Sequence, residues 1–295
     1  MTNPVEQDRW WPLCLTEQVL AVKPAAMSYG EVELVLFRDE AGQVRALEDR
    51  CPHRRAPLSL GRITADGHIQ CGYHGWIFDG ETGAVSGFPN LEEGERLPRC
   101  AVKTYPVHEA DGWVYLWPGA SEPGRAPERQ QVPEIHTGVQ FHGQAMQALT
   151  HHECVAALLD SPGLLLRYLG VEFLDKALGD PYVEGDVLVA DRAARWNLVG
   201  ESALYLGPLR HRADFPLRLR TATAGVTGQT SAWLYAGEDR LLAQFELVLV
   251  PTTRAMTAIS WRAVINPGAH GILAPLVRGL CKLGISPFTM FSSVN

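Results

Sequence analysis

Cysteine is scarce in this chain, and the positions it occupies are far apart. Six cysteines occur in 295 residues: Cys14, Cys51, Cys71, Cys100, Cys154 and Cys281. Small secreted domains that depend on disulfides use many more cysteines for their length. The first residues, MTNPVEQDRWWPL, include acidic side chains and lack the apolar core of a secretion signal. The sequence therefore predicts a protein without a disulfide framework in a reducing compartment, the cytoplasm.

Long apolar runs and basic clusters are also missing. No run of about 18 apolar residues without charge occurs, so no transmembrane segment is expected. The nearest approach, residues 271–290, contains Arg278 and Lys282 and is typical of an amphipathic helix packed on a core, with a helix lying on a membrane surface as the alternative. The net charge of −7 and the scattered positions of the 26 basic residues argue against nucleic-acid binding.

The first part of the chain has the pattern of a small all-β domain. β-Branched and aromatic segments such as VELVLF at 32–37 and GWVYLW at 112–117 alternate with turns rich in glycine and aspartate. Residues 118–133 combine four prolines with glycines and charges, as linkers do. These patterns predict a first domain over residues 1–118, a linker over 119–133 and a second domain over 134–295.

The second part mixes both kinds of element, which predicts an α+β domain. Two short segments near the start of this part have a helical pattern. Strand-like runs follow them, and a final helix ends the domain. The expected helices are 153–159, 164–169 and 272–283, and the expected strands are 187–190, 231–235, 241–250 and 256–264.

Four metal-binding residues stand out in the first domain. Cys51-Pro-His53 is followed, after seventeen residues, by Cys71-Gly-Tyr-His74. Two thiolates and two imidazoles are the ligands of a Rieske [2Fe–2S] cluster, with two cysteines on one iron and two histidines on the other. A Cys₂His₂ zinc site uses the same side chains but pairs cysteine with cysteine and histidine with histidine. Because the types alternate within each half here, we interpret the motif as a Rieske cluster site.

The neighbours of these ligands indicate the kind of cluster. Compared with respiratory Rieske proteins, Ala56 and Tyr73 stand where those proteins place a disulfide, and Trp76 and Phe78 where they place hydroxyls. Fewer hydrogen bonds to the cluster sulfurs predict a potential toward the low end of the Rieske range. Since the chain has no GxGxxG dinucleotide fingerprint, its electrons are expected from a separate NAD(P)H-dependent reductase or a ferredoxin.

These motifs resemble the oxygenase (α) component of the Rieske non-haem iron oxygenases. The similarity is strongest over residues 8–118, in Trp10-Trp11-Pro12, in the LEDRCPHR segment at 47–54 and in YHGWIFD at 73–79. The resemblance implies an α+β fold in which an all-β Rieske domain precedes a helix-grip (START-like) domain. It also implies a mononuclear iron above a pocket for a hydrophobic small molecule, and a homotrimer or a mixed oligomer with a related oxygenase subunit.

The family's iron signature, Asp-x-x-His-x-x-x-x-His, is altered in this chain. Asp160 stands at the acidic position, which in the family links one subunit's cluster to its neighbour's iron, and Gly163 and Tyr168 stand at the two histidine positions. Glycine has no ligand atom, and the expected third ligand, an acid near the C-terminus, has no counterpart after Glu246. We therefore expect mononuclear Fe(II) to be absent. Asp160 is either the inter-subunit acid or a residue of the turn before Pro162.

A rebuilt iron site is the alternative. His151 and His152 precede Asp160 by about two helical turns but diverge by about 100° on a helix, so they cannot easily bind one metal together. One of them could join Asp160 and a distant histidine such as His211; otherwise both are surface or capping residues.

Three functions remain open at this point. The first is a redox protein of oxygenase ancestry that acts as a redox subunit or as an unconventional redox enzyme. The second is an active monooxygenase with unconventional iron ligands. The third is a non-redox binder of a hydrophobic ligand, and the intact set of four cluster ligands argues against it.

Overall fold

The computed structural model describes residues 8–89, 91, 96–127, 138–196, 217–237 and 239–290. The chain divides into two compact units, one formed by residues 1–130 with 250–254 and the other by 131–249 with 255–295. Residues 128–133 of the predicted linker lie outside the described part, as does His211.

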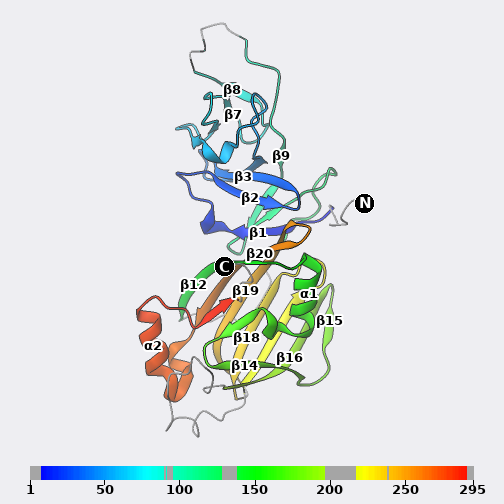
Figure 1. The fold of residues 1–295 in the computed structure, drawn as a ribbon, viewed down its shortest axis with the longest axis vertical. Helices are drawn as coiled ribbons and strands as arrows, with labels where there is room; N and C mark the ends of the chain where they lie inside the picture. Colours follow the sequence, from blue (N-terminus) through cyan, green and yellow to red (C-terminus); the bar gives the residue numbers. More distant parts are fainter. Residues whose placement is uncertain are drawn as a thin grey trace. The chain divides into compact units, whose positions relative to one another are not determined.

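The first unit consists of short antiparallel strands in three small sheets (Figure 1). The sheet orders are β1-β11-β10, β2-β3-β4-β9 and β5-β6-β7-β8. The strand bounds are β1 Trp11–Leu15, β2 Ala25–Tyr29, β3 Val32–Arg38, β4 Val44–Glu48, β5 Arg62–Ile63, β6 Ile69–Gln70, β7 Ile77–Phe78, β8 Val85–Gly87, β9 Thr104–Tyr105, β10 Val107–Ala110 and β11 Trp113–Leu116, with short 3₁₀ turns η1 at Thr16–Gln18 and η2 at Leu58–Leu60.

The apolar strand β3 forms the centre of this unit. Four consecutive side chains, Leu34 to Phe37, are fully buried, as expected for a β-rich run covered on both faces. Phe37 packs with Ile69 and Phe78 of the β5–β8 sheet and with Cys51 and Cys71. The loops that contain the predicted cluster ligands are therefore anchored in the hydrophobic core.

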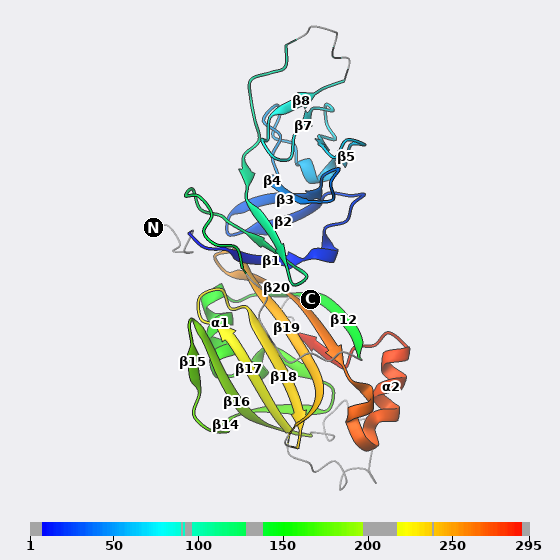
Figure 2. The same ribbon diagram turned by 180° about the vertical axis from the view of Figure 1, so that it is seen from behind.

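The second unit is a large antiparallel sheet with few helices (Figures 1 and 2). In the described residues ten strands form it, in the order β12-β20-β19-β18-β17-β16-β14-β13-β21, with β15 paired to β16. The bounds are β12 Val139–Gln147, β13 Leu166–Tyr168, β14 Val171–Ala177, β15 Tyr182–Glu184, β16 Val187–Trp196, β17 Leu217–Ala224, β18 Thr230–Ala236, β19 Arg240–Thr253, β20 Met256–Ile265 and β21 Phe288–Met290, with α1 His151–Asp160, η3 Pro162–Leu164, η5 Pro267–Leu273 and α2 Ala274–Lys282.

Helix α1 crosses one face of this sheet (Figure 1). A capping box begins it: the Thr150 hydroxyl accepts a hydrogen bond from the Glu153 N–H, and the Glu153 carboxylate accepts one from the Thr150 N–H. Its apolar side, Cys154, Val155 and Leu158, joins the core of the sheet. The expected α+β class and the helix over 153–159 are confirmed.

The helix expected over 164–169 is wrong. Residues 162–164 form the 3₁₀ turn η3, and Leu166–Tyr168 form strand β13, which pairs with β21. Leu166 and Tyr168 are buried while Arg167 between them is exposed, so the segment has the period of a strand. A short apolar run does not distinguish helix from strand on the sequence alone.

The expected C-terminal helix, 272–283, is shorter than predicted. Helix α2 spans Ala274–Lys282 and follows the 3₁₀ turn η5, which begins at Pro267. Within the described ranges, no helix combines the length and the apolar character needed to cross a bilayer.

Candidate functional site

The first predicted cluster loop is a tight turn after β4. The Cys51 N–H donates to the Ala56 carbonyl at 2.9 Å, and the Arg55 N–H donates to the Cys51 carbonyl at 2.7 Å. Arg55 has a φ of 59°, in the left-handed region that most residues avoid. The cysteine is thus held at the base of the loop, and His53 lies at its exposed tip.

The second loop repeats this arrangement between β6 and β7. The Cys71 N–H donates to the Trp76 carbonyl at 2.8 Å, and the Gly75 N–H donates to the Cys71 carbonyl at 3.0 Å. Gly75 has a φ of 73°, and a Cβ atom there would lie 2.4 Å from Cγ of Pro89. Glycine is therefore required at this position, which in the first loop is occupied by Arg55.

The two loops bring the four predicted ligands together. The His53 and His74 rings lie 4.7 Å apart between centroids, and Trp76 stacks on His53 at 4.7 Å. Both cysteines are 2% exposed, whereas both histidines are exposed. Burial chiefly raises the pKa of Cys51, and the neighbouring Cys71 adds to the rise. Partial desolvation, with His74 and Arg54, lowers the pKa of His53.

This donor set fits a two-iron cluster better than a single ion. The structure presents the four donors as two pairs of different burial, with the Cys51 and Cys71 thiols inside the unit and the His53 and His74 rings at its surface. A Cys₂His₂ zinc site needs all four around one ion. A [2Fe–2S] cluster instead needs a buried thiolate pair and a separate imidazole pair, as found here.

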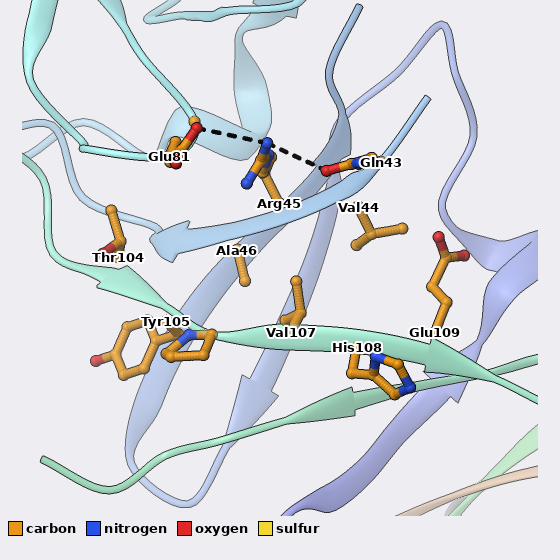
Figure 3. Close-up of a pocket in the computed structure, with 12 residues that line it drawn as sticks. Gln43, Val44, Arg45, Ala46, Glu81, Thr104, Tyr105, Val107, His108 and Glu109 are labelled. Carbon is orange, nitrogen blue, oxygen red and sulfur yellow. Dashed lines mark hydrogen bonds and ion pairs between the residues drawn. The ribbon is translucent and has the colours of Figure 1, made fainter. Parts of the chain in front are cut away.

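The first unit also contains a groove of about 430 Å³ away from these loops, between β4 and the β9–β10 segment (Figure 3). Its lining mixes charged and polar side chains with apolar ones such as Val44, Ala46 and Val107. Arg45 lies within it, 3.3 Å from the Gln43 side chain and 3.8 Å from the Glu81 carboxylate. This groove therefore does not match the hydrophobic pocket that the family resemblance implied.

The altered iron signature lies at the end of α1 and just beyond it. Asp160 is the last residue of α1 and is exposed; Gly163 is in η3; Tyr168 is in β13. A Cβ atom at Gly163 would lie 3.3 Å from both Cβ and the carbonyl oxygen of Phe173, so even a small side chain would be crowded there.

The Tyr168 hydroxyl forms a hydrogen bond with a buried residue that the sequence pattern did not predict. Its hydroxyl lies 2.6 Å from Nε2 of His270, whose Nδ1 lies 2.8 Å from the Asn266 carbonyl. A carbonyl only accepts, so Nδ1 bears the proton and Nε2 accepts from the phenol. Tyr168 is 4% and His270 0% exposed. Burial raises the pKa of Tyr168 and lowers that of His270 to about 4, which keeps both groups neutral.

A second unanticipated residue is Arg192 of β16. This 6% exposed side chain donates to the Leu159 carbonyl near the end of α1, and to the Thr221 hydroxyl at 3.2 Å. Burial lowers its pKa, while Asp160 and Asp175 act in the opposite direction. A cation at a helix C-terminus satisfies carbonyls that have no partner within the helix, so Arg192 fixes the end of α1 that presents Asp160.

Replacing Arg192 by methionine tests this role. We expect Arg192→Met to lower the free energy of unfolding by about 1–3 kcal/mol, because a carbonyl and a hydroxyl lose a buried donor. The matched control, Arg195→Met on the same strand, removes an arginine that is 64% exposed and paired with Glu172, and should cost less than about 1 kcal/mol. Urea denaturation measures both; equal losses would contradict the assignment.

The two histidines considered as substitute iron ligands lie in different environments on helix α1. His151 is half-buried and donates from Nε2 to the Thr227 carbonyl at 3.0 Å, whereas His152 is exposed. Burial lowers the pKa of His151. Thr150, not either histidine, caps α1.

Comparison with known proteins places the first unit in a family. Residues 9–106 match the Rieske [2Fe-2S] domain. Protein TIC 55, chloroplastic, of Arabidopsis thaliana is 39% identical over 145 residues, which are 45% of this chain and 26% of that protein. The oxygenase component of dicamba O-demethylase from Stenotrophomonas maltophilia is 39% identical over 125 residues, 41% of this chain and 36% of that protein. The chain thus spans about a quarter to a third of the length of these relatives.

The fold extends the resemblance to the whole chain. The crystal structure of dicamba monooxygenase bound to dicamba superposes with a TM-score of 0.67 at 22% sequence identity, over 95% of this chain and 82% of the other. The protein therefore contains a Rieske [2Fe–2S] domain. Its resemblance to the Rieske non-haem iron oxygenases, in sequence over the first unit and in fold over both, is confirmed.

Proposed function

We propose that this protein is a Rieske oxidoreductase of oxygenase ancestry that transfers electrons without a mononuclear iron of its own. It acts as a redox subunit, in a homotrimer or in a mixed oligomer with a related oxygenase subunit, or as an unconventional redox enzyme on a hydrophobic small molecule. Residues 1–118 form the Rieske domain and residues 134–295 the helix-grip domain, joined by a linker over 119–133.

The observation that supports the proposal best is the buried hydrogen bond between Tyr168 and His270. At the second histidine position of the family's iron signature, its phenol is buried and donates a hydrogen bond to Nε2 of His270 at 2.6 Å. A neutral phenol with a raised pKa is a poor ligand for Fe(II), which prefers imidazole and carboxylate in such sites. At the first position, Gly163 offers no donor atom.

The cluster ligands we propose are Cys51, His53, Cys71 and His74. When bound, the cluster accepts and releases one electron at a time. The chain's own contribution is to bury the thiolate pair and expose the imidazole pair, which places the histidine-bound iron nearest to any redox partner. Trp76 and Phe78 bring no hydroxyl to the cluster sulfurs, and this supports a low potential.

The electron donor is a separate reductase or a ferredoxin. Two structural neighbours with TM-scores just above 0.5 are oxygenases in complex with ferredoxin, and this supports a ferredoxin-type donor. All six cysteines are free, which supports a reducing compartment, the cytoplasm by our proposal; some relatives are chloroplastic. Asp160, exposed at the end of α1, is our candidate for the acid that meets a neighbouring subunit.

An active monooxygenase with other iron ligands is the second candidate, favoured by relatives such as pheophorbide a oxygenase of Oryza sativa, 37% identical over 149 residues. Nitric oxide separates the two. It binds open-sited mononuclear Fe(II) and gives a high-spin EPR signal. The reduced protein, incubated with Fe(II), freed of unbound iron by gel filtration and then exposed to nitric oxide, should show no high-spin signal. A stoichiometric high-spin signal would contradict our proposal in favour of the monooxygenase.

A further inference from the structure

Helix α2 has three faces of different character. It lies at the margin of the large sheet (Figures 1 and 2), and Ala274 and Val277 on its inner face are buried. Its second face consists of leucines and its third face is basic. The leucines are Leu276, Leu280 and Leu283, and the basic residues are Arg278 and Lys282. Because residues three and four positions apart share one side of a helix, each of these sets forms a continuous strip.

The leucine strip is only partly covered by the rest of the unit. Leu276 and Leu280 are half-buried, whereas Leu283 is 75% and Ile285 49% exposed. Leu169, in the turn between β13 and β14, is 46% exposed, and its N–H donates to the carbonyl two residues beyond Ile285 at 2.8 Å. Exposed apolar side chains are unremarkable when they occur singly, but these five come together from two neighbouring segments. We call them the apolar face.

A Schellman motif at the end of α2 adds Ile285 to this face. The Gly284 N–H donates to the Cys281 carbonyl at 3.1 Å, and the Ile285 N–H donates to the Leu280 carbonyl at 3.0 Å. Gly284 has a φ of 72°, a left-handed conformation that glycine adopts without strain. The chain therefore reverses after α2 and brings Ile285 back beside Leu280, where it remains exposed.

Positive charge accompanies the apolar face. Arg278 and Lys282 are exposed, and neither forms an ion pair within the ranges that the structure describes. No Asp or Glu follows Glu246, although the whole chain has a net charge of −7. Leucines on one side of a helix and basic residues on another are typical of helices that lie on a membrane surface. There the leucines enter the boundary between headgroups and acyl chains, and the basic side chains meet anionic headgroups.

We propose that the apolar face, together with Arg278 and Lys282, docks the second unit on an anionic lipid surface. This inference goes beyond the proposed function and does not depend on it. A second copy of this chain fits the face less well, because a two-fold contact would bring the same positive charges toward each other. Docking is non-covalent, with α2 lying along the bilayer surface.

Co-sedimentation of the holoprotein with vesicles tests the proposal. The vesicles contain phosphatidylcholine alone or an equal mixture with phosphatidylglycerol, and wild type should bind the mixed vesicles more tightly. We expect Leu283→Gln/Ile285→Gln to weaken binding to the mixed vesicles at least 10-fold, because two apolar side chains no longer enter the bilayer surface. Arg278→Gln/Lys282→Gln should weaken it by roughly 10- to 30-fold at low ionic strength, and this difference should narrow as salt is added.

The control is Leu20→Gln/Val22→Gln, the same change at two exposed apolar residues of the first unit. Leu20 is 53% and Val22 85% exposed, between η1 and β2, so the control removes apolar surface at a site without the α2 strip. It should bind the mixed vesicles like wild type. The proposal is overturned if wild type binds neither kind of vesicle, if Leu283→Gln/Ile285→Gln binds as tightly as wild type, or if the control loses as much binding.

Two measurements without lipid exclude other roles for the face. Urea denaturation of Leu283→Gln/Ile285→Gln should match wild type, since both residues are exposed; a large loss of stability would place the face in the core and contradict the proposal. Sedimentation velocity should give the same mass for both proteins. If the variant changes the oligomeric mass, the face is a contact between copies of this chain, and the lipid assignment is wrong.

Discussion

A Cys51→Ser substitution is expected to remove the Rieske EPR signal and the visible absorption of the cluster completely. Cys51 is 2% exposed and lies in the hydrophobic core with Cys71. A serine hydroxyl is not ionised at neutral pH and cannot replace a thiolate on iron. Because the loop is held by main-chain bonds between Cys51, Arg55 and Ala56, the polypeptide fold should persist while the cluster is lost.

The matched control is Cys100→Ser in the same unit. Cys100 is partly buried and packs against the same core, but it lies outside both cluster loops. We expect this variant to retain a full cluster, measured as EPR spin per chain and acid-labile sulfide. A Cys51→Ser protein that keeps the wild-type signal would refute the ligand assignment, and a Cys100→Ser protein that loses it would show that core packing, not ligation, is being measured.

The second large effect is an acid sensitivity that His270 imparts to the second unit. Its pKa in the folded state is about 4, below the ordinary value of 6.5, because the ring is buried. Between these two values the unfolded chain binds a proton that the folded chain does not. The stability contribution is therefore complete above pH 6.5 and is lost as the pH falls toward 4. A shift of this size corresponds to roughly 3 kcal/mol.

Comparison of wild type with His270→Gln isolates this contribution. The variant removes the titration while keeping a polar side chain near Tyr168. The free energy of unfolding is measured by urea denaturation from pH 7 to pH 4. Its slope against pH should be larger in wild type than in the variant, by up to the slope that one bound proton gives. Parallel curves for the two proteins would show that His270 is protonated in the fold or is not buried as described.

Local sequence patterns indicate the two loops that hold the proposed cluster ligands. Hydrogen bonds close each loop within six residues, from Cys51 to Ala56 and from Cys71 to Trp76. The types and spacing of the ligand residues are therefore nearly enough to predict the conformation of each loop. The capped helix α1 was predictable for the same reason, since Thr150 and Glu153 cap it from within the same turn.

The second unit was less predictable because its contacts are distant in sequence. Strand β13 pairs with β21 more than a hundred residues later, and a short apolar run carries no sign of such a partner. Tyr168 finds His270 across 102 positions, and Arg192 reaches the end of α1 from another strand. Only the three-dimensional fold brings these groups together.

The central claim, that the chain holds a Rieske cluster but no mononuclear iron, is tested most directly by counting iron and acid-labile sulfide in protein purified without chelators and reconstituted with excess Fe(II) and sulfide. A [2Fe–2S] cluster alone predicts two irons and two sulfides per chain, with one Rieske spin after reduction. Three irons and two sulfides per chain, with the third iron surviving gel filtration, would contradict the account.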